Sequence, residues 1–132
     1  MTAGQICTRG VETATKHESV YVAARRMNDR NVDSLVIVDD TATPIGIITD
    51  RDLRMRVLAE DNDPHLTTVG EVMSERLRTV DVEAPVERAL EIMRSGPYRR
   101  LPVIDETGML IGLLSIDDIL TELAEEFHLV GS

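Results

Sequence analysis

The sequence contains two similar segments that lie 66 residues apart. Residues 46–53 read Gly-Ile-Ile-Thr-Asp-Arg-Asp-Leu, and residues 112–119 read Gly-Leu-Leu-Ser-Ile-Asp-Asp-Ile. Residues 13–53 align with residues 79–119 without a gap. Ten of these 41 pairs are identical, against about two or three expected by chance. The identical pairs are Thr13/Thr79, Val20/Val86, Ala23/Ala89, Met27/Met93, Leu35/Leu101, Asp39/Asp105, Thr41/Thr107, Ile45/Ile111, Gly46/Gly112 and Asp52/Asp118. The chain is therefore built from two copies of one unit.

The chain length limits how these copies fold. A chain of 132 residues ordinarily forms one domain with a workable core, whereas half that length is marginal alone. We therefore expect the two repeats to bury apolar surface against each other as a pseudo-symmetric pair.

The first repeat begins with a short strand at residues 12–14. Val20, Ala23, Ala24 and Met27 fall at helical spacing after Ser19, which predicts an amphipathic helix capped by Ser19 and ending near residue 30. Residues 35–38 form an apolar, β-branched run that predicts a buried strand. Residues 45–48 predict a second strand, antiparallel to it, and residues 50–60 a helix.

The second repeat has the same order of elements, β-α-β-β-α. Its helix begins after Pro85, its paired strands lie at residues 101–104 and 110–114, and its last helix starts near residue 116. One face of that helix carries Ile116, Ile119, Leu120, Leu123 and Phe127. The length of this stripe favours contact with another subunit, although packing within its own repeat is an equal alternative.

These elements predict a mixed α/β (α+β) fold with the following divisions. Residues 1–10 form an N-terminal segment with a helical turn at residues 3–7, and residues 11–60 form the first repeat. Residues 61–76 are a linker with a connecting helix, residues 77–128 are the second repeat, and residues 129–132 are a tail.

The composition limits which partners the protein can bind and in which cellular compartment it is expected. Twenty-four acidic side chains against 14 basic ones give a net charge of −10, which opposes nonspecific binding to nucleic acid or to an anionic membrane. Cys7 is the only cysteine, so no intramolecular disulfide forms. No apolar run approaches the roughly 18 residues of a membrane span. We expect a soluble protein of the cytoplasm.

The duplicated segment places polar side chains where a strand enters a helix. Free amide groups of a first helical turn favour anions and ligand phosphates there. A carboxylate at this position can accept hydrogen bonds from a ribose diol. Asp52 and Asp118 are therefore candidate ribose ligands, with the hydroxyls of Thr49 and Ser115 nearby. The alternative is structural: Thr-x-x-Asp and Ser-x-x-Asp are also ordinary helix caps.

Together, the two Gly-h-h-Thr/Ser-x-x-Asp motifs (h, apolar), the preceding runs at residues 35–39 and 101–105 and the β-α-β-β-α order resemble a tandem pair of CBS domains, the Bateman module, as a stand-alone protein. The resemblance covers nearly the whole chain. It implies two repeats packed through their sheets, with a cleft on either side of a pseudo-two-fold axis. Such clefts often bind AMP, ADP, ATP or S-adenosylmethionine.

The resemblance also implies which residues line each cleft. One cleft takes Thr49 and Asp52 from the first repeat, with Arg51 beside them, and Arg99 and Arg100 from the second. Three arginines suit phosphate groups through bidentate, charge-assisted hydrogen bonds. This is the cleft in which we expect a nucleotide to bind preferentially.

The opposite cleft combines Ser115 and Asp118 with Ser34. Asp33 stands there in place of Arg99, and Asp117 in place of Arg51. These carboxylates would repel a phosphate, so we expect weaker binding. Aliphatic adenine walls are expected from a set of strand residues, namely Val36, Ile48, Val103 and Leu114.

Enzymatic motifs are absent from the sequence. His17, His65 and His128 show no metal-ligand spacing, and neither a nucleophile elbow nor a phosphate-binding loop occurs. We expect no catalytic residue, no metal and no required cofactor. The predicted function is ligand sensing by a homodimer that pairs through its helices, with occupancy passed to a regulated protein of unknown identity. The alternative is a structural dimerisation or interaction module whose clefts bind nothing.

Overall fold

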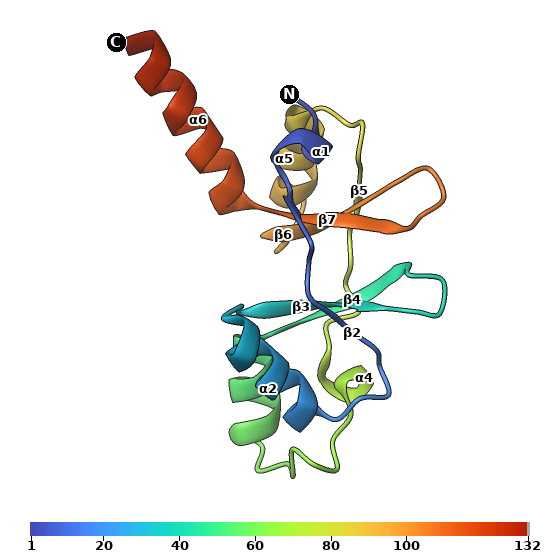
Figure 1. Ribbon diagram of the computed structural model, residues 1–132. Coiled ribbons are helices and arrows are strands. Elements are labelled where there is room, and N and C mark those ends of the chain that lie inside the picture. The colour runs from blue at the N-terminus through green and yellow to red at the C-terminus, as the bar shows by residue number, and fades with distance from the viewer. Residues whose placement is uncertain (132) are drawn as a thin grey trace. The chain divides into compact units, whose positions relative to one another are not determined.

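The computed structural model describes residues 1–131, with side chains described as far as Glu126. Ser132, at the end of the predicted tail, and the side chains of Phe127 and His128 lie outside the described residues. The fold is a mixed α/β fold (Figure 1). The chain divides into two compact units. The first unit comprises Val11–Leu77, and the second comprises Met1–Gly10 together with Arg78–Ser132.

The first unit contains a three-stranded sheet with helices packed on it. Its elements are β2 (Thr13–Ala14), α2 (Val20–Arg30), β3 (Ser34–Val38), β4 (Pro44–Thr49), α3 (Asp50–Leu53), the π-helical turn η1 (Arg54–Leu58) and α4 (Val69–Val72). Strand β3 lies in the middle, parallel to β2 and antiparallel to β4. The predicted antiparallel strand pair is therefore confirmed.

Helix α2 forms where the sequence predicted it. The Ser19 hydroxyl accepts a hydrogen bond from the Val22 amide at 3.2 Å, which satisfies one of the free donors of the first turn. At the other end Asn31 adopts a left-handed conformation with φ 54°, a common helix stop. Val20, Ala23 and Met27 on one face are buried against strand residues in a single apolar cluster.

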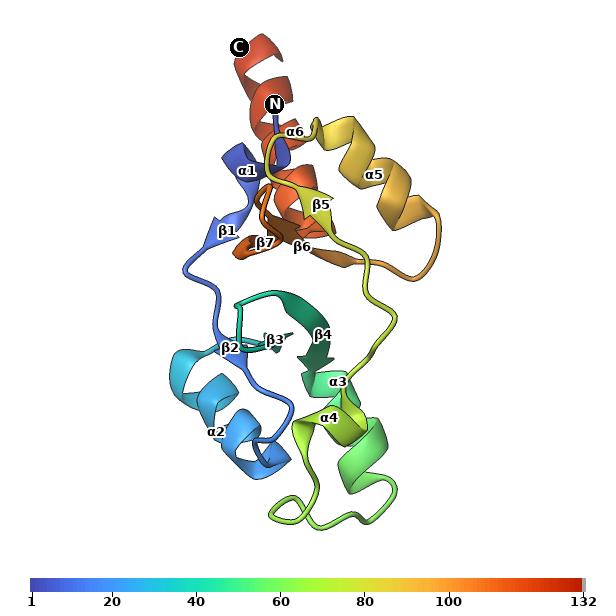
Figure 2. The same cartoon turned by 90° about the vertical axis from the view of Figure 1, so that its right-hand side faces the viewer.

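The second unit has the same plan with one strand more (Figure 2). Its elements are α1 (Ala3–Ile6), β1 (Thr8–Arg9), β5 (Val80–Asp81), α5 (Val86–Arg94), β6 (Arg100–Ile104), β7 (Leu110–Ser115) and α6 (Ile116–Gly131). The sheet order is β1-β7-β6-β5, with β5 parallel to β6 and the other two pairs antiparallel. Leu101, Leu114 and Ile119 lie at the centre of its core.

The leading segments of the two repeats are exchanged between the units. Strand β1, near the N-terminus, pairs with β7 of the second unit, with Thr8 opposite Leu113. In the first unit Ser74, which follows α4, forms the equivalent bridge to Ile47. Helices α1 and α4, and residues Thr8 and Ser74, are each 66 positions apart. The duplication therefore extends towards the N-terminus beyond residues 13–53. The leading segment of the first repeat packs on the sheet of the second unit, and that of the second repeat packs on the sheet of the first unit.

The helix after β4 departs from its predicted form. A continuous helix was expected from residue 50 to about residue 60, whereas the α-helix gives way to a π-helical turn at Arg54, closed by the bond from Ala59 N to Arg54 O at 2.9 Å. Such turns are rare, and they are frequent at functional sites. Within this turn Arg56 donates from Nη1 to the carbonyl oxygens of Val72, at 3.0 Å, and Met73, at 3.4 Å. The arginine thereby caps the end of α4.

Each strand hairpin is closed by an aspartate at the same position of the repeat. Asp39 Oδ1 accepts hydrogen bonds from Thr41 N and Oγ1 and from Thr43 N, at 2.8–3.0 Å. Asp105 repeats the arrangement with Thr107 and Met109. The threonine hydroxyls, with the backbone amides, hold the pKa of both carboxyls below their usual value.

Because these pKa values are lowered in the folded state, the turns contribute stability above the unfolded pKa of about 3.9, and this contribution is lost as the pH falls through the folded values. We expect the double variant Asp39→Asn, Asp105→Asn to melt a few degrees lower than the wild type at pH 7 and to lose less of its melting temperature between pH 5 and pH 3. Thermal unfolding followed by circular dichroism measures both. Asp40→Asn, the same change at a neighbouring turn residue, is the control variant.

Candidate functional site

The first strand-to-helix corner is formed by β4 and α3. Thr49 ends the strand and is the N-cap of the helix. Asp52 Oδ2 accepts hydrogen bonds from the Thr49 amide at 2.9 Å and from its hydroxyl at 3.1 Å, and the Asp52 amide donates to Thr49 Oγ1 at 3.2 Å. This reciprocal capping box fixes the carboxylate at the end of the strand.

The second corner has the same geometry. Ser115 ends β7, and its amide donates to Asp118 Oδ2 at 3.0 Å. The Asp118 amide donates back to Ser115 Oγ at 3.1 Å. The two corners thus differ in the side chains around them and hardly at all in their backbone arrangement.

The capping geometry leaves part of each carboxylate unused. Within the described part of the chain, Oδ1 of Asp52 and Oδ1 of Asp118 take part in no hydrogen bond, and both side chains are half-buried. A carboxylate oxygen accepts two hydrogen bonds. Each aspartate can therefore cap its helix with one oxygen and accept from a ligand hydroxyl with the other, so that the two predicted roles are compatible.

The residues that begin the middle strands lie next to the motif of their own unit. Ser34 is opposite Thr49 in the register of β3 and β4, and Arg100 is opposite Ser115 in that of β6 and β7. Ser34 is buried, Arg100 is half-buried, and Arg51 and Arg99 are exposed.

The predicted site that joins Thr49, Arg51 and Asp52 to Arg99 and Arg100 draws residues from both units, and it stays a prediction. The weaker site that joins Ser34 to Ser115 and Asp118 also draws on both units and has the same status.

The residues expected to enclose adenine are all buried. Ile48, Val103 and Leu114 are fully buried within the apolar clusters of their units. Val36 is also fully buried, and it alternates along β3 with Leu35 and Ile37, which belong to the cluster. It therefore points to the opposite face of the sheet.

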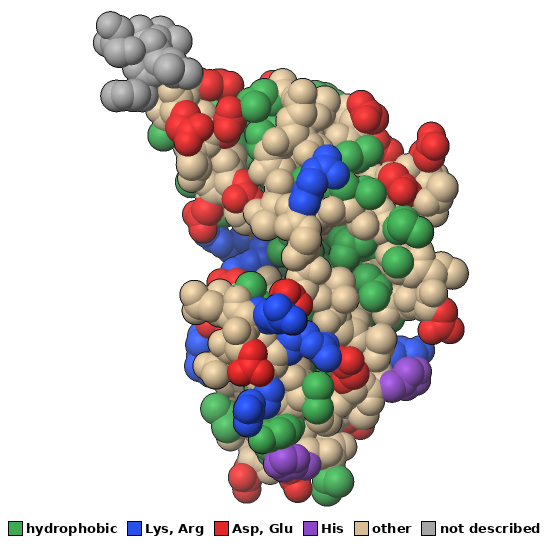
Figure 3. Space-filling view, viewed as in Figure 1, with side chains coloured by type: hydrophobic (Ala, Val, Ile, Leu, Met, Phe, Trp, Pro, Cys, Tyr) green, Lys and Arg blue, Asp and Glu red, His purple; other side chains and the backbone are tan. Residues whose placement is uncertain are grey.

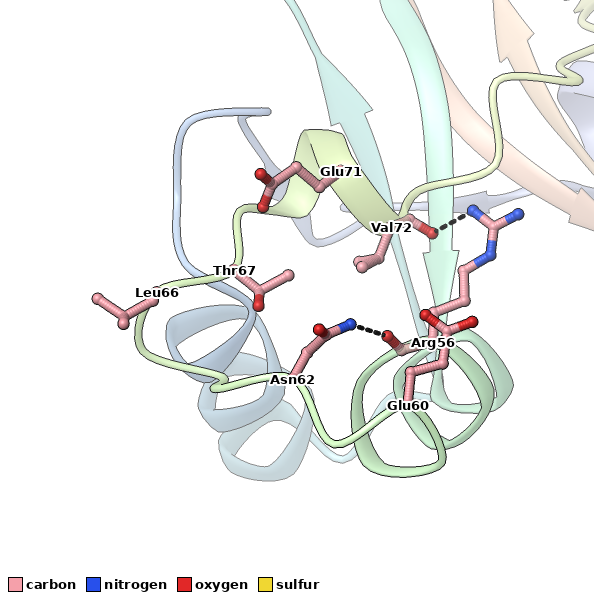
Figure 4. A pocket seen from close by; sticks show the side chains of 7 residues that line it. All are labelled: Arg56, Glu60, Asn62, Leu66, Thr67, Glu71 and Val72. Atoms are coloured by element: carbon pink, nitrogen blue, oxygen red, sulfur yellow. Dashed lines mark hydrogen bonds between the residues drawn. The ribbon is translucent and has the colours of Figure 1, made fainter.

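A hollow of about 620 Å³ in the first unit was not predicted. It lies between η1, the chain that follows it and α4 (Figure 4), and Arg56, Glu60, Asn62 and Thr67 are among the side chains that line it. The Asn62 amide donates to Arg56 O at 2.8 Å. No sequence motif marks this hollow, because its walls come from a π-helical turn and an irregular return segment.

The face shown in Figure 3 bears both acidic and basic side chains, with acidic ones gathered over α6. In the described part of the chain no cluster of three or more His, Cys, Asp or Glu side chains is arranged to hold a metal ion. Nor does any helix there have the length and apolarity needed to cross a membrane.

The CBS domain family model matches residues 3–59 and 69–125. Among curated proteins, Hypoxic response protein 1 of Mycobacterium tuberculosis (strain H37Rv) is 34% identical over 124 residues, which cover 94% of this chain and 86% of that protein. The uncharacterized protein MK0525 of Methanopyrus kandleri is 34% identical over 120 residues, and the chain spans 61% of its length.

Solved structures agree with the sequence comparison. The crystal structure of Hypoxic Response Protein I with two coordinated zinc ions is similar with a TM-score of 0.81 at 33% identity, covering 92% of this chain and 98% of that one. The CBS domain pair of protein MJ0100, in complex with 5-methylthioadenosine and S-adenosyl-L-methionine, is similar with a TM-score of 0.83 at 25% identity, covering 96% and 98%. With both of its repeats matched by the family model, this chain belongs to the CBS domain family.

Proposed function

We propose that this chain is a non-enzymatic regulatory module that binds an adenosine compound through the Thr49–Asp52 corner. The observation that carries the proposal is the Asp52 carboxylate, held by Thr49 through Oδ2 at 2.9 Å and 3.1 Å while Oδ1 remains able to accept from a ribose hydroxyl. The similar domain pair of protein MJ0100 has been solved with two adenosine compounds, which supports this class of ligand.

The charges around the two corners favour the first one for a phosphorylated ligand. Arg51 follows Thr49 by two residues, whereas the equivalent residue after Ser115 is Asp117, and both side chains are exposed. A phosphate is attracted by the arginine and repelled by the aspartate. We propose AMP, ADP or ATP as the ligand at the first corner, with Arg99 and Arg100 as further phosphate partners, and a neutral nucleoside or S-adenosylmethionine for the second.

The proposed mechanism is a shift between conformations. A ligand favours one arrangement of the chain only by the difference between its affinities for the two arrangements. The regulated protein would read that arrangement. The exposed apolar side chains of Met55 and Leu58 on η1 and of Leu120 on α6 support the proposal that two copies pair through these helices.

Isothermal titration calorimetry with AMP, ADP, ATP and S-adenosylmethionine tests this function. We expect Asp52→Asn to weaken binding of the preferred nucleotide by about 10–100-fold, since a hydrogen bond to a charged group contributes about 1.5–3 kcal/mol. Asparagine retains an oxygen for the Thr49 amide and so preserves the cap. Asp50→Asn, on the exposed side of the same helical turn, is the matched control and should bind like the wild type.

Two results would count against the proposal. If none of the four compounds gives heat or raises the melting temperature, the chain is not an adenosine sensor, and the rival function of a structural dimerisation module gains support. Sedimentation velocity without ligand then tests that rival directly. If Asp118→Asn weakens nucleotide binding as much as Asp52→Asn, the preference for the first corner is wrong even though binding itself stands.

A further inference from the structure

A short piece of chain, residues 72–74, is bonded to the strand on one side of the Thr49–Asp52 corner. Ser74 N donates to Ile47 O at 2.9 Å, and Ile47 N donates to Ser74 O at 3.3 Å. Ile47 lies in β4, two residues before Thr49. The strand side of the corner is therefore fixed to residues 72–74.

The same piece of chain is bonded to the helical segment on the other side of the corner. Arg56 donates from Nη1 to Val72 O at 3.0 Å and to Met73 O at 3.4 Å. Figure 4 shows its side chain reaching from η1 to the Val72 carbonyl. We call the hydrogen bonds that join Ile47 and Arg56 to residues 72–74 the corner clamp.

The piece of chain that both sides share is itself firmly held. Helix α4 begins with a hydrogen bond from Val69 N to Glu18 O at 2.8 Å, and Val69 and Val72 are buried in the core of the first unit. The last carbonyl groups of a helix have no partner within it, and here the Arg56 guanidinium supplies one. The clamp therefore ties Arg56 to a fixed point of the unit.

Helix α3 depends on this tie because it has little packing of its own. None of its four residues is buried, and Leu53 packs only partly buried against the core cluster. In η1, which continues the helix, Val57 is the buried side chain. The direction in which α3 leaves β4, and with it the direction of the Asp52 carboxylate, is therefore set by Val57 and by the bonds of Arg56.

The second unit anchors its corner differently. Glu122 stands at the position of Arg56, 66 residues later, and an ionised carboxylate cannot donate to carbonyl groups. The helix is anchored instead by Ile119, which directly follows Asp118 and is only 1% exposed. Leu53, the counterpart of Ile119, is half-buried. The helix side of the clamp thus belongs to the first corner and has no counterpart at the second.

We propose that Arg56 is a positioning residue for the ligand of the first corner. Through the corner clamp it fixes the angle between β4 and α3, and so holds Asp52 Oδ1 where a ribose hydroxyl can reach it. Preorganisation of this kind lowers the cost of binding. A ligand that bonds to Asp52 in turn stabilises the clamp, since coupling between two sites is reciprocal. This role rests on the adenosine binding proposed above.

The first test needs no ligand. The Asp52 amide donates to Thr49 Oγ1 at 3.2 Å, and the Val36 amide donates to Glu12 O at 3.2 Å in the sheet, so that hydrogen exchange followed by NMR reports the corner and the core separately. We expect Arg56→Gln, whose side chain is too short to hold both carbonyl groups, to lower the protection of the Asp52 amide by about fivefold or more. The protection of the Val36 amide should change by about twofold or less.

The second test is calorimetry with AMP and with adenosine. We expect Arg56→Gln to weaken both ligands by about tenfold, because the position of Asp52 matters to the ribose that they share. Arg56→Lys, whose ammonium group can donate to the same carbonyl groups, should recover most of the affinity. Arg54→Gln is the matched control. It removes a neighbouring arginine of η1 that pairs with Asp50 at the surface at 3.3 Å, and it should change either affinity by about twofold or less.

Four results would overturn this role of Arg56. Unchanged protection of the Asp52 amide shows that the clamp does not hold the corner, and an equal loss at Val36 shows that Arg56 only stabilises the whole unit. A loss of affinity for AMP alone shows that the guanidinium acts on the phosphate through its charge. Equal losses from Arg56→Gln and Arg54→Gln show that the bonds to α4 are not the cause. If the wild type binds neither ligand, the adenosine proposal fails, whereas hydrogen exchange still decides whether Arg56 holds Asp52 in place.

Discussion

Leu101→Ala is expected to lower the free energy of unfolding of the second unit by about 2–5 kcal/mol. Leu101 is fully buried and lies opposite Leu114 in the pairing of β6 with β7, within the same apolar cluster as Ile119. Truncation removes these contacts and leaves a cavity that the paired strands cannot close. Because small domains are stable by only about 5–15 kcal/mol, much of the stability would be lost. Urea unfolding followed by circular dichroism measures the change.

Two further leucines give this experiment its controls. Leu35, the identical residue of the first repeat, is equally buried and lies in the other cluster, so that Leu35→Ala should have an effect of similar size. Leu66 is 80% exposed, and Leu66→Ala should cost about 0.5 kcal/mol or less. A small effect of Leu101→Ala beside a large one of Leu66→Ala would contradict the described core.

Gly112→Ala is expected to destabilise the second unit by about 1–3 kcal/mol. A Cβ atom at this position would lie 2.6 Å from Cys7 Sγ and 2.7 Å from Thr8 O. The first contact can be relieved by rotation of the thiol. The second is a backbone oxygen of β1, which cannot move without loosening its pairing with β7. If residues 1–10 did not pack on this sheet, the substitution would be close to neutral. Thermal unfolding distinguishes the two cases.

A double-mutant cycle with Cys7→Ala separates these two contacts. Removal of the sulfur should recover part of the stability lost in Gly112→Ala, while the clash with Thr8 O remains. Complete recovery would mean that β1 adapts freely, and no recovery would mean that rotation of the thiol already relieves its contact with the new Cβ. Burial raises the pKa of the Cys7 thiol. We therefore expect this thiol in the wild type to react slowly with iodoacetamide at pH 7.

The regular elements were predictable because each is specified by local spacing. The stripe of Val20, Ala23 and Met27 predicted α2, and the β-branched run before Asp39 predicted β3. The turn residues Asp39 and Asp105 are among the identical pairs because each holds its hairpin closed. Local spacing did not predict η1, since a π-helical turn of five residues is too short to show a hydrophobic periodicity of its own.

The positions of the two strand-to-helix corners were predicted from the sequence, whereas the role of their aspartates was predicted only in part. The sequence allowed Asp52 and Asp118 to be either ribose ligands or caps, and the structure shows that Oδ2 caps while Oδ1 is left over. The adenine walls were inferred from apolar character alone. Such an inference does not tell which face of a strand a side chain occupies, and Ile48, Val103 and Leu114 belong to the cores.

The exchange of leading segments was beyond local reasoning. Strand β1 has two residues, and its pairing with β7 joins parts of the chain more than a hundred positions apart. The glycine that opens each duplicated motif did carry a signal of it. Gly46 faces Ser74 O, 2.9 Å from where a Cβ would stand, as Gly112 faces Thr8 O. Glycine at a strand interior often marks such a close approach of a second backbone.

The same exchange sets the order in which the protein can fold as it leaves the ribosome. The first unit has all its parts once Leu77 has emerged, whereas α1 and β1, which are made first, belong to a sheet that is completed only when β7 has emerged. At about 5–20 residues per second, the ten N-terminal residues wait roughly 2–8 s between the emergence of Leu77 and that of Ser115, the last residue of β7. A cut between the repeats at residues 60–66 would therefore separate each sheet from its leading segment. Fragments intended to fold independently should begin at Val11 and end at Leu77.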